Sequence, residues 1–238
     1  MELSPLLQAA KSGNLSELTK LHKGGASLDE THKNGASALI LAAENNHFDV
    51  VKYLIENGAD PAKQTTMGAT ALNRAAEVGN TEMMKYLLDN GTPIGDLALI
   101  IAAREGKLEA VKLLVESGAD VNFQQRWGQT ALMLASREGH AEVVKYLIEA
   151  GASVRLRDKN GDTALMIAND NDNIDIAMQL RRAGAKPEPK KKAASPAPVE
   201  DDDDDSEPTE SEMESLDSGD FDDIASDDEE EETRFSDD

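Results

Sequence analysis

Two short patterns recur along this chain in one register, and this regularity limits what the chain can fold into. The first is a leucine preceded by Ala or Pro, found at Leu6, Leu39, Leu72, Leu99, Leu132 and Leu165. The second is a glycine followed by Ala or Thr, found at Gly25, Gly58, Gly91, Gly118, Gly151 and Gly184. Both series step by 33, 33, 27, 33 and 33 residues. Because both markers share one six-residue deletion, they predict six copies of one unit.

Within a copy, the residues indicate two short helices. In the second copy, Ser37 offers a hydroxyl N-cap and residues 39–43 form a small apolar face. Residues 50–55 supply a second apolar face, and Gly58 follows where a left-handed C-cap is expected. We place the copies approximately at residues 1–33, 34–66, 67–94, 95–126, 127–159 and 160–185.

The two ends of the array differ from its interior. The first copy opens with Ser4 and Pro5, a cap and a favourable first helical residue. The last copy has a polar turn and carries Gln179, Arg181 and Arg182 late in its second helix. We therefore expect polar capping units at both ends of a stacked array.

These patterns resemble the ankyrin repeat family over residues 1–185. The fifth copy, WGQTALMLASREGHAEVVKYLIEAGASV, matches the family's G-x-T, A-L-x-x-A, G-H, V-V-K-x-L-[IL] and G-A. The resemblance implies an all-α repeat solenoid of paired antiparallel helices with β-hairpin or loop fingers. The family's T-P-L-H becomes T-A-L-N, T-A-L-M or S-A-L-I, so we expect apolar substitutes for the histidine and weaker hairpin ordering. The deletion between copies three and four has the length of a hairpin finger, so one finger should be missing.

Most of the chain's net charge of −23 belongs to its C-terminal segment. From Lys186 onward, 53 residues hold 23 acidic and 5 basic side chains, and few of them are large and apolar. Such a composition cannot bury enough surface to fold, so residues 186–238 are predicted to be a disordered acidic tail. Met213, Leu216, Phe221 and Ile224 form one face of a helical projection, which indicates either a docking motif or incidental apolar residues.

Composition also disfavours several functions. With no cysteine there is no disulfide framework or thiol nucleophile, and no apolar run resembles a membrane span or signal peptide. We therefore expect an intracellular protein, cytoplasmic and/or nuclear, without membrane contact. Net acidity argues against direct binding of nucleic acid. His47 and His140 occupy a structural position of the family, and we predict no catalytic residue, cofactor, metal or small-molecule substrate.

A local reversal of charge marks the candidate binding surface. From Arg126 to Lys159 there are six basic and four acidic residues. The resemblance implies that fingertips and the exposed turn of each first helix face the concave binding side. The candidates there are Arg104, Glu105, Arg126, Trp127, Gln129, Arg137, Glu138, Arg155, Arg157, Lys159, Asn160 and Asp162. Trp127, the only tryptophan, either is an interface hot spot or packs against the adjacent finger.

Four residues are candidate modification sites. Thr209, Ser211 and Ser226 each have an acid three residues on, which resembles sites of acidophilic kinases. The segment that ends at Asn122 resembles ankyrin-repeat substrates of an asparaginyl hydroxylase. The alternative is that Asn122 simply closes a turn.

Three functional hypotheses follow, all for a monomeric, non-enzymatic protein. The first is an escort that holds one partner on its concave face while the acidic tail shields or recruits a basic protein, histone-like or ribosomal. The second is a signalling or assembly adaptor whose tail only solubilises it or is phosphorylated. The third is an inhibitory subunit of an enzyme. Fold alone does not choose among them.

Overall fold

A computed structural model describes residues 3–186 of the chain. The predictions made for the tail, including its disorder and the sites at Thr209, Ser211 and Ser226, lie outside the described residues. The helices are α1 (Pro5–Ser12), α2 (Leu15–Lys23), α3 (Ala38–Glu44), α4 (Phe48–Glu56), α5 (Ala71–Val78), α6 (Thr81–Asp89), α7 (Asp96–Arg104), α8 (Leu108–Glu116), α9 (Ala131–Glu138), α10 (Ala141–Glu149), α11 (Ala164–Asp170) and α12 (Ile174–Arg182). The predicted six helix pairs and the all-α repeat solenoid are confirmed.

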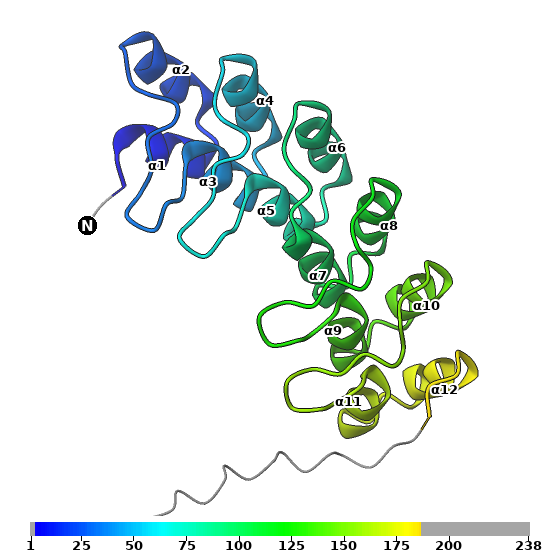
Figure 1. Cartoon of the computed structure of the whole chain (residues 1–238). Helices are drawn as coiled ribbons and strands as arrows, with labels where there is room; N and C mark the ends of the chain where they lie inside the picture. Colours follow the sequence, from blue (N-terminus) through cyan, green and yellow to red (C-terminus); the bar gives the residue numbers. More distant parts are fainter. Residues whose placement is uncertain (1–2, 187–238) are drawn as a thin grey trace, which may run out of the picture. The chain divides into compact units, whose positions relative to one another are not determined.

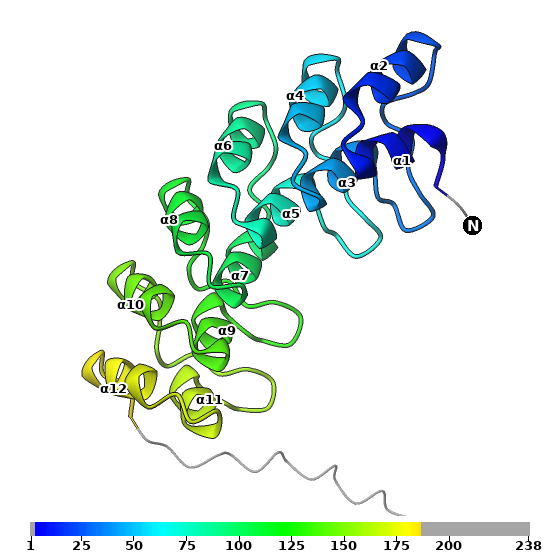
Figure 2. The same cartoon turned by 180° about the vertical axis from the view of Figure 1, so that it is seen from behind.

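The helix pairs lie side by side in a curved row (Figure 1). Each odd-numbered helix packs against the odd-numbered helices of the neighbouring pairs and against its own even-numbered partner. The even-numbered helices form an outer layer, and the loops between pairs project from the opposite side, as Figure 2 shows from behind. This arrangement places the loops and the odd-numbered helices on one common face.

Local sequence explains where the helices begin and end. Hydroxyl side chains cap five of the first helices: the Oγ of Ser37 accepts from the backbone N–H of Ile40 at 3.3 Å, and Ser4, Thr70, Thr130 and Thr163 act alike. The six glycines of the second pattern follow the even-numbered helices with φ between 85° and 97°. A left-handed residue there ends the helix, and only glycine adopts it at little cost.

The core consists mainly of small residues and leucines. Ala42, Ala43, Ala75 and Ala76 are fully buried, which allows neighbouring first helices to approach closely. Each repeat adds a buried leucine from the first pattern, such as Leu132. The array therefore builds one continuous core from contacts between adjacent repeats.

Fingers of equal length connect most of the helix pairs, and one finger is missing as predicted. We name the fingers by their residues: 24–37, 57–70, 117–130 and 150–163. Only residues 90–95 join α6 to α7, which leaves a break in the row of fingers (Figure 1). The fingers contain little β-structure, in agreement with the expected weaker hairpin ordering: the described residues contain a single isolated β-bridge, between Thr31 and Ser37.

The break divides the fingers into two hydrogen-bonded pairs. In the N-terminal pair, the backbone N–H of Thr66 donates to the carbonyl of Asn34 at 2.8 Å. In the C-terminal pair, the N–H of Lys159 donates to the carbonyl of Trp127 at 3.0 Å. The two fingers of each pair are thereby joined to each other, and the second pair carries most of the candidate binding residues.

Side chains at the start of the even-numbered helices join consecutive repeats. The Nε2 of His47 lies 3.0 Å from the carbonyl oxygen of Lys11, and the Nε2 of His140 lies 2.8 Å from that of Arg104. The amide of Asn173 donates in the same way to the carbonyl of Ser136. The structural interpretation of His47 and His140 agrees with these contacts.

The expectation of apolar substitutes for the family's histidine is correct at most positions and wrong at one. Ile40, Met133 and Met166 are apolar and buried, but Asn73 is polar and 1% exposed. Its side-chain oxygen accepts from the hydroxyl of Thr70 at 2.9 Å. A buried amide is tolerated there because it has a hydrogen-bond partner.

Candidate protein-binding surface

The tip of finger 117–130 presents the only tryptophan of the chain to the exterior. The ring of Trp127 is 61% exposed, although tryptophan side chains are usually well buried. The tip backbone is fixed, because the N–H of Gly128 donates to the carbonyl of Gln125 at 2.7 Å. Trp127 is therefore not buried against the adjacent finger, although Lys159 of that finger lies near its ring, and a backbone hydrogen bond closes the turn that carries it.

Two cations flank this ring from two different fingers. The Cζ of Arg126 lies 5.7 Å from the ring centroid, and the Nζ of Lys159 lies 5.9 Å from it. Both distances fall near the outer limit of cation–π contact, about 6 Å. Arg155 adds a third exposed cation on finger 150–163. We call Arg126, Trp127, Arg155 and Lys159 the fingertip patch.

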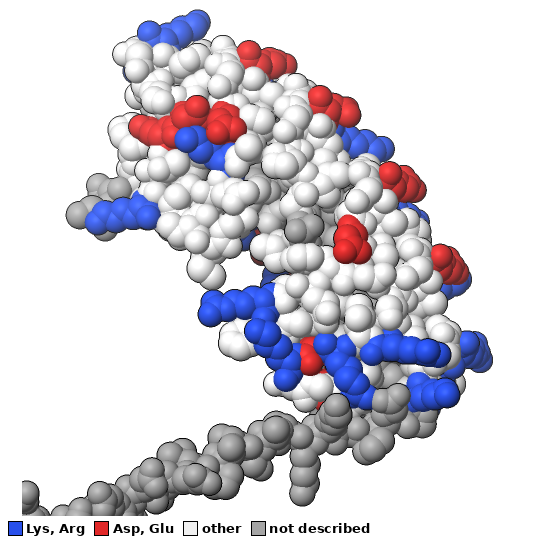
Figure 3. Space-filling view, viewed as in Figure 1, with Lys and Arg blue, Asp and Glu red and all other residues white. Residues whose placement is uncertain are grey.

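The three cations of the fingertip patch form no ion pair with any carboxylate of residues 3–186. Figure 3 shows lysine and arginine side chains gathered over the C-terminal fingers, at the bottom of the view, whereas the middle of this face carries few charges. Unpaired cations on the same two fingers as an exposed aromatic ring are suited to bind anionic groups of a partner.

Other predicted candidates on finger 150–163 shape the finger itself. Asp158 is buried, and its Oδ1 accepts from the N–H groups of Asn160 and Asp162, both at 2.9 Å. The guanidinium of the half-buried Arg157 donates to the carbonyl of Gly161. Asn160 is exposed at the tip, but Arg157 and Asp162 contribute to the turn as well as to the surface.

Two glutamines stabilise the C-terminal finger pair: Gln129, a predicted candidate, and Gln124, which the sequence did not indicate. The side-chain oxygen of Gln129 accepts from the amide of Gln125 at 2.8 Å. The amide of Gln124 donates to the carbonyls of Gly128, at 2.7 Å, and Arg157, at 2.9 Å. Gln124 thus bridges the two fingers, and no sequence pattern marks a contact between fingers 33 residues apart.

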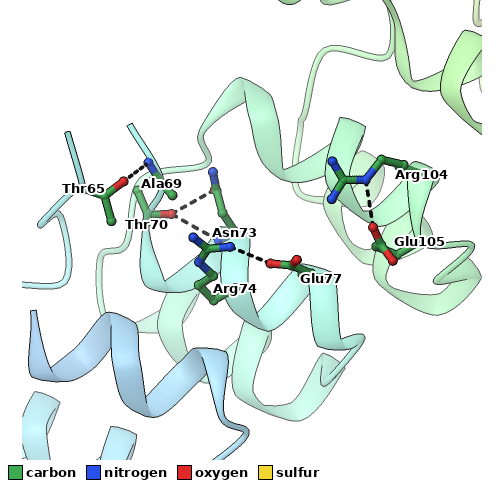
Figure 4. A network of polar contacts seen from close by, with 8 residues as sticks. All are labelled: Thr65, Ala69, Thr70, Asn73, Arg74, Glu77, Arg104 and Glu105. Carbon is green, nitrogen blue, oxygen red and sulfur yellow. Dashed lines mark hydrogen bonds and ion pairs between the residues drawn. The ribbon is translucent and has the colours of Figure 1, made fainter. Parts of the chain in front are cut away.

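Of the candidates at the first helices, Arg104 and Glu105 form an ion pair near the break. The Nε of Arg104 lies 2.8 Å from a carboxylate oxygen of Glu105, and Arg74 pairs with Glu77 at 2.8 Å in the repeat before the break (Figure 4). These ion pairs are partly exposed and contribute little to stability. A partner can therefore replace them by ion pairs with its own side chains. Arg137 is half-buried and Glu138 is exposed, with no ion pair between them.

A second apolar fingertip, Met67, was also missed. It is 85% exposed at the tip of finger 57–70. Repeat register was the available signal, because Met67 and Trp127 share one position of their repeats, at which fingers 24–37 and 150–163 carry Asn34 and Asn160. The two apolar tips belong to the fingers on either side of the break.

Asn122 is hydrogen-bonded both within its own turn and to the following repeat. Its side-chain oxygen accepts from the N–H of Ser153 at 2.7 Å, and its own N–H donates to Asp120 at 2.8 Å. These contacts favour the turn-closing interpretation of Asn122.

Within residues 3–186, no three His, Asp or Glu side chains are placed to hold a metal ion. No helix of this part is long and apolar enough to cross a membrane.

A stack of helix pairs with projecting loops and an exposed, cationic fingertip patch defines a repeat protein of the binding-module class. A family model of ankyrin repeats in three copies matches residues 6–97 and again 99–191. The chain belongs to the ankyrin repeat family. Ankyrin repeats are generally protein-interaction modules and are typically non-catalytic.

Two solved structures show the closeness of the fold. The human ASB11 ankyrin repeat domain is 28% identical, with a TM-score of 0.71 over 77% of this chain and 85% of that one. A chain in the complex of the predatory endopeptidase Bd0816 from Bdellovibrio bacteriovorus with the immunity protein Bd3460 is 26% identical, with a TM-score of 0.68 over 76% of this chain and 99% of that one. No curated protein sequence matched the chain.

Proposed function

We propose that the protein is a non-catalytic escort that holds one partner protein through its fingers and recruits a basic protein through its acidic tail. The observation that carries the first half is the exposed Trp127 between Arg126 and Lys159, because Trp and Arg are the residues most enriched at interface hot spots. The charge of the tail supports the second half, since 23 acidic residues compete with nucleic acid for lysine-rich surfaces.

The proposed basic partner is histone-like or ribosomal, and the protein acts as a monomer in the cytoplasm or nucleus. Poly-L-lysine and purified core histones serve as probes of the tail. We expect the full chain to bind both, with an affinity that falls steeply between about 50 and 500 mM salt because exposed charges are screened. Replacing Asp201–Asp205 by asparagine should weaken the binding of both probes. If the variant binds them as tightly as the wild type does, the proposed role of the tail is refuted.

The finger half of the proposal is tested by affinity capture with two baits. The wild-type chain and its Trp127→Ala variant are compared, and captured proteins are identified by mass spectrometry. We expect at least one protein that the wild type retains and the variant loses. Identical captures by the two baits would contradict a partner site at the fingers.

An inhibitory subunit of an enzyme is the second candidate function. It is favoured by the similarity to a chain from the complex of an endopeptidase with an immunity protein. If the captured partner is an enzyme, titration with this chain should lower its activity. A partner without activity, or one whose activity is unchanged at saturation, supports the escort or an assembly adaptor instead.

A further inference from the structure

We propose that the fingertip patch recognises an acidic segment of its partner protein in which an aromatic or large aliphatic side chain stands between carboxylates. This inference rests on the proposed function and specifies the chemistry of the partner at the fingers. The ligand that it predicts is a short linear pattern of the type acid, large apolar residue, acid.

The apolar part of this pattern follows from the exposed ring of Trp127. The turn that carries Trp127 is already formed in the free protein. The carbonyl of Trp127 accepts a hydrogen bond from the N–H of Lys159, and the N–H of Gly128 closes the turn by donating to the carbonyl of Gln125. Gly128 has φ +74°, and an added Cβ would lie 3.0 Å from the backbone nitrogen of Lys159. The two fingers are therefore in close backbone contact, and binding at the ring requires little ordering of the tip.

The acidic part follows from the charges around the ring. Arg126 and Lys159 lie 5.7 and 5.9 Å from the ring centroid and belong to two different fingers, so each of two carboxylates beside one apolar ligand side chain has a cation near the ring to pair with. The nearest acid in sequence, Asp158, is buried, accepts two backbone hydrogen bonds and forms no ion pair with the exposed lysine beside it. A basic segment would be repelled by these cations. The fingertip patch and the acidic tail are therefore expected to bind ligands of opposite charge.

Single-stranded nucleic acid is the competing ligand, because its bases stack on aromatic rings and its phosphates pair with cations. A nucleic acid carries a phosphate at every nucleotide, so a chain of net charge −23 repels it more strongly than it repels a short protein segment with a few carboxylates. We therefore assign the fingertip patch to an acidic protein segment and use an oligonucleotide as an arm of the test.

The probe is a fluorescein-labelled peptide, DSGDFDDIASDD, which contains the required pattern and copies residues 217–228 of the chain. Binding to the full chain is measured by fluorescence anisotropy at about 50 mM salt, below the strong screening of physiological buffers. Trp127→Ala should weaken binding by about tenfold or more, as expected for a hot spot. Arg126→Gln and Lys159→Gln should each weaken it several-fold and reduce its salt dependence.

Matched controls separate recognition from general surface effects. Ile174→Ala removes another exposed apolar side chain, 70% exposed on α12, and Lys145→Gln removes an exposed cation of α10. Both variants should bind the peptide within about twofold of wild type. A peptide with alanine in place of its phenylalanine should bind about tenfold more weakly.

Three results would overturn the inference. The first is binding of the Trp127→Ala variant, or of the alanine peptide, within twofold of the parent. The second is tighter, Trp127-dependent binding of a twelve-nucleotide oligothymidylate than of the peptide at the same salt. The third uses the full chain with Phe221→Ala and asparagine at residues 220, 222 and 223. If this variant binds the peptide more than tenfold better than wild type, the chain's own tail and not a partner is the occupant.

The peptide experiment and the tests of the proposed function fail separately. Trp127→Ala should leave binding to poly-L-lysine unchanged. Loss of peptide recognition with intact binding of poly-L-lysine removes only this inference. The reverse result removes the escort role of the tail and keeps the fingertip patch.

Discussion

The contact between Gly106 and His140 gives a quantitative test of how consecutive repeats are joined. Gly106 has φ +67°, and a Cβ added to it would lie 2.6 Å from two atoms of the His140 ring. That ring donates from Nε2 to the carbonyl of Arg104 at 2.8 Å. A Gly106→Ala substitution therefore both strains the backbone and displaces the histidine from its hydrogen bond.

The expected magnitude is a sum of two effects. A left-handed backbone costs a residue with a Cβ about 1–2 kcal/mol, and loss of the hydrogen bond costs about 0.5–1.5 kcal/mol. Gly106→Ala should thus lower the free energy of unfolding by about 1.5–3.5 kcal/mol. Gly68→Ala is the matched control, because Gly68 has φ +78° but open space at the position of a Cβ. It should cost only about 1–2 kcal/mol.

A double-mutant cycle isolates the contact itself. In a His140→Ala background the ring is absent, so Gly106→Ala should cost only the backbone strain. The coupling energy between the two substitutions should therefore be about 0.5–1.5 kcal/mol, measured by urea unfolding followed by far-ultraviolet circular dichroism. Additivity within about 0.3 kcal/mol would refute the idea that this histidine joins the repeats.

Three further predictions use the same unfolding assay or mass spectrometry. Leu132→Ala removes a fully buried leucine of the fifth repeat and should cost about 2–5 kcal/mol; a cost below about 0.5 kcal/mol would contradict the assigned register. Deletion of residues 187–238 should leave the urea midpoint nearly unchanged at moderate salt, because this segment contains few large apolar residues; a large loss would show that the segment belongs to the fold. Asn122 should show no added oxygen in peptide maps of protein made in a eukaryotic cell, because its side-chain oxygen accepts a hydrogen bond from the N–H of Ser153 and the residue closes a turn. A shift of +16 Da on the peptide that contains Asn122 would contradict the turn-closing interpretation.

The sequence by itself determined those features that depend on local backbone requirements and on spacing. The 33-residue period specified six repeats, and one 27-residue step located the missing finger between α6 and α7. Ser4 and Ser37 were identified as caps because a hydroxyl before an apolar helix satisfies free N–H groups. Such features involve residues a few positions apart, so a single sequence contains the necessary information.

Only the tertiary structure decided which candidate side chains are available to a partner. Trp127 and Arg157 are both finger candidates in the sequence, yet the first is exposed and the second is half-buried. The placement of each finger depends on contacts with its neighbour, such as the hydrogen bond that the amide of Gln124 donates to the carbonyl of Arg157. Two backbones more than 30 residues apart must first be placed side by side before these hydrogen bonds exist.

The same reason explains the residues that depart from the repeat pattern. Asn73 takes an apolar position of the repeat, but its burial is satisfied by the cap residue Thr70, which the pattern alone does not indicate. Ile174 occupies the position at which Phe48 lies 5.6 Å, ring to ring, from Tyr86 of the following repeat. No further repeat follows α12 within the described residues, so Ile174 is exposed. Whether a side chain is core or surface thus depends on the neighbour that the stack provides, not on its position in the repeat.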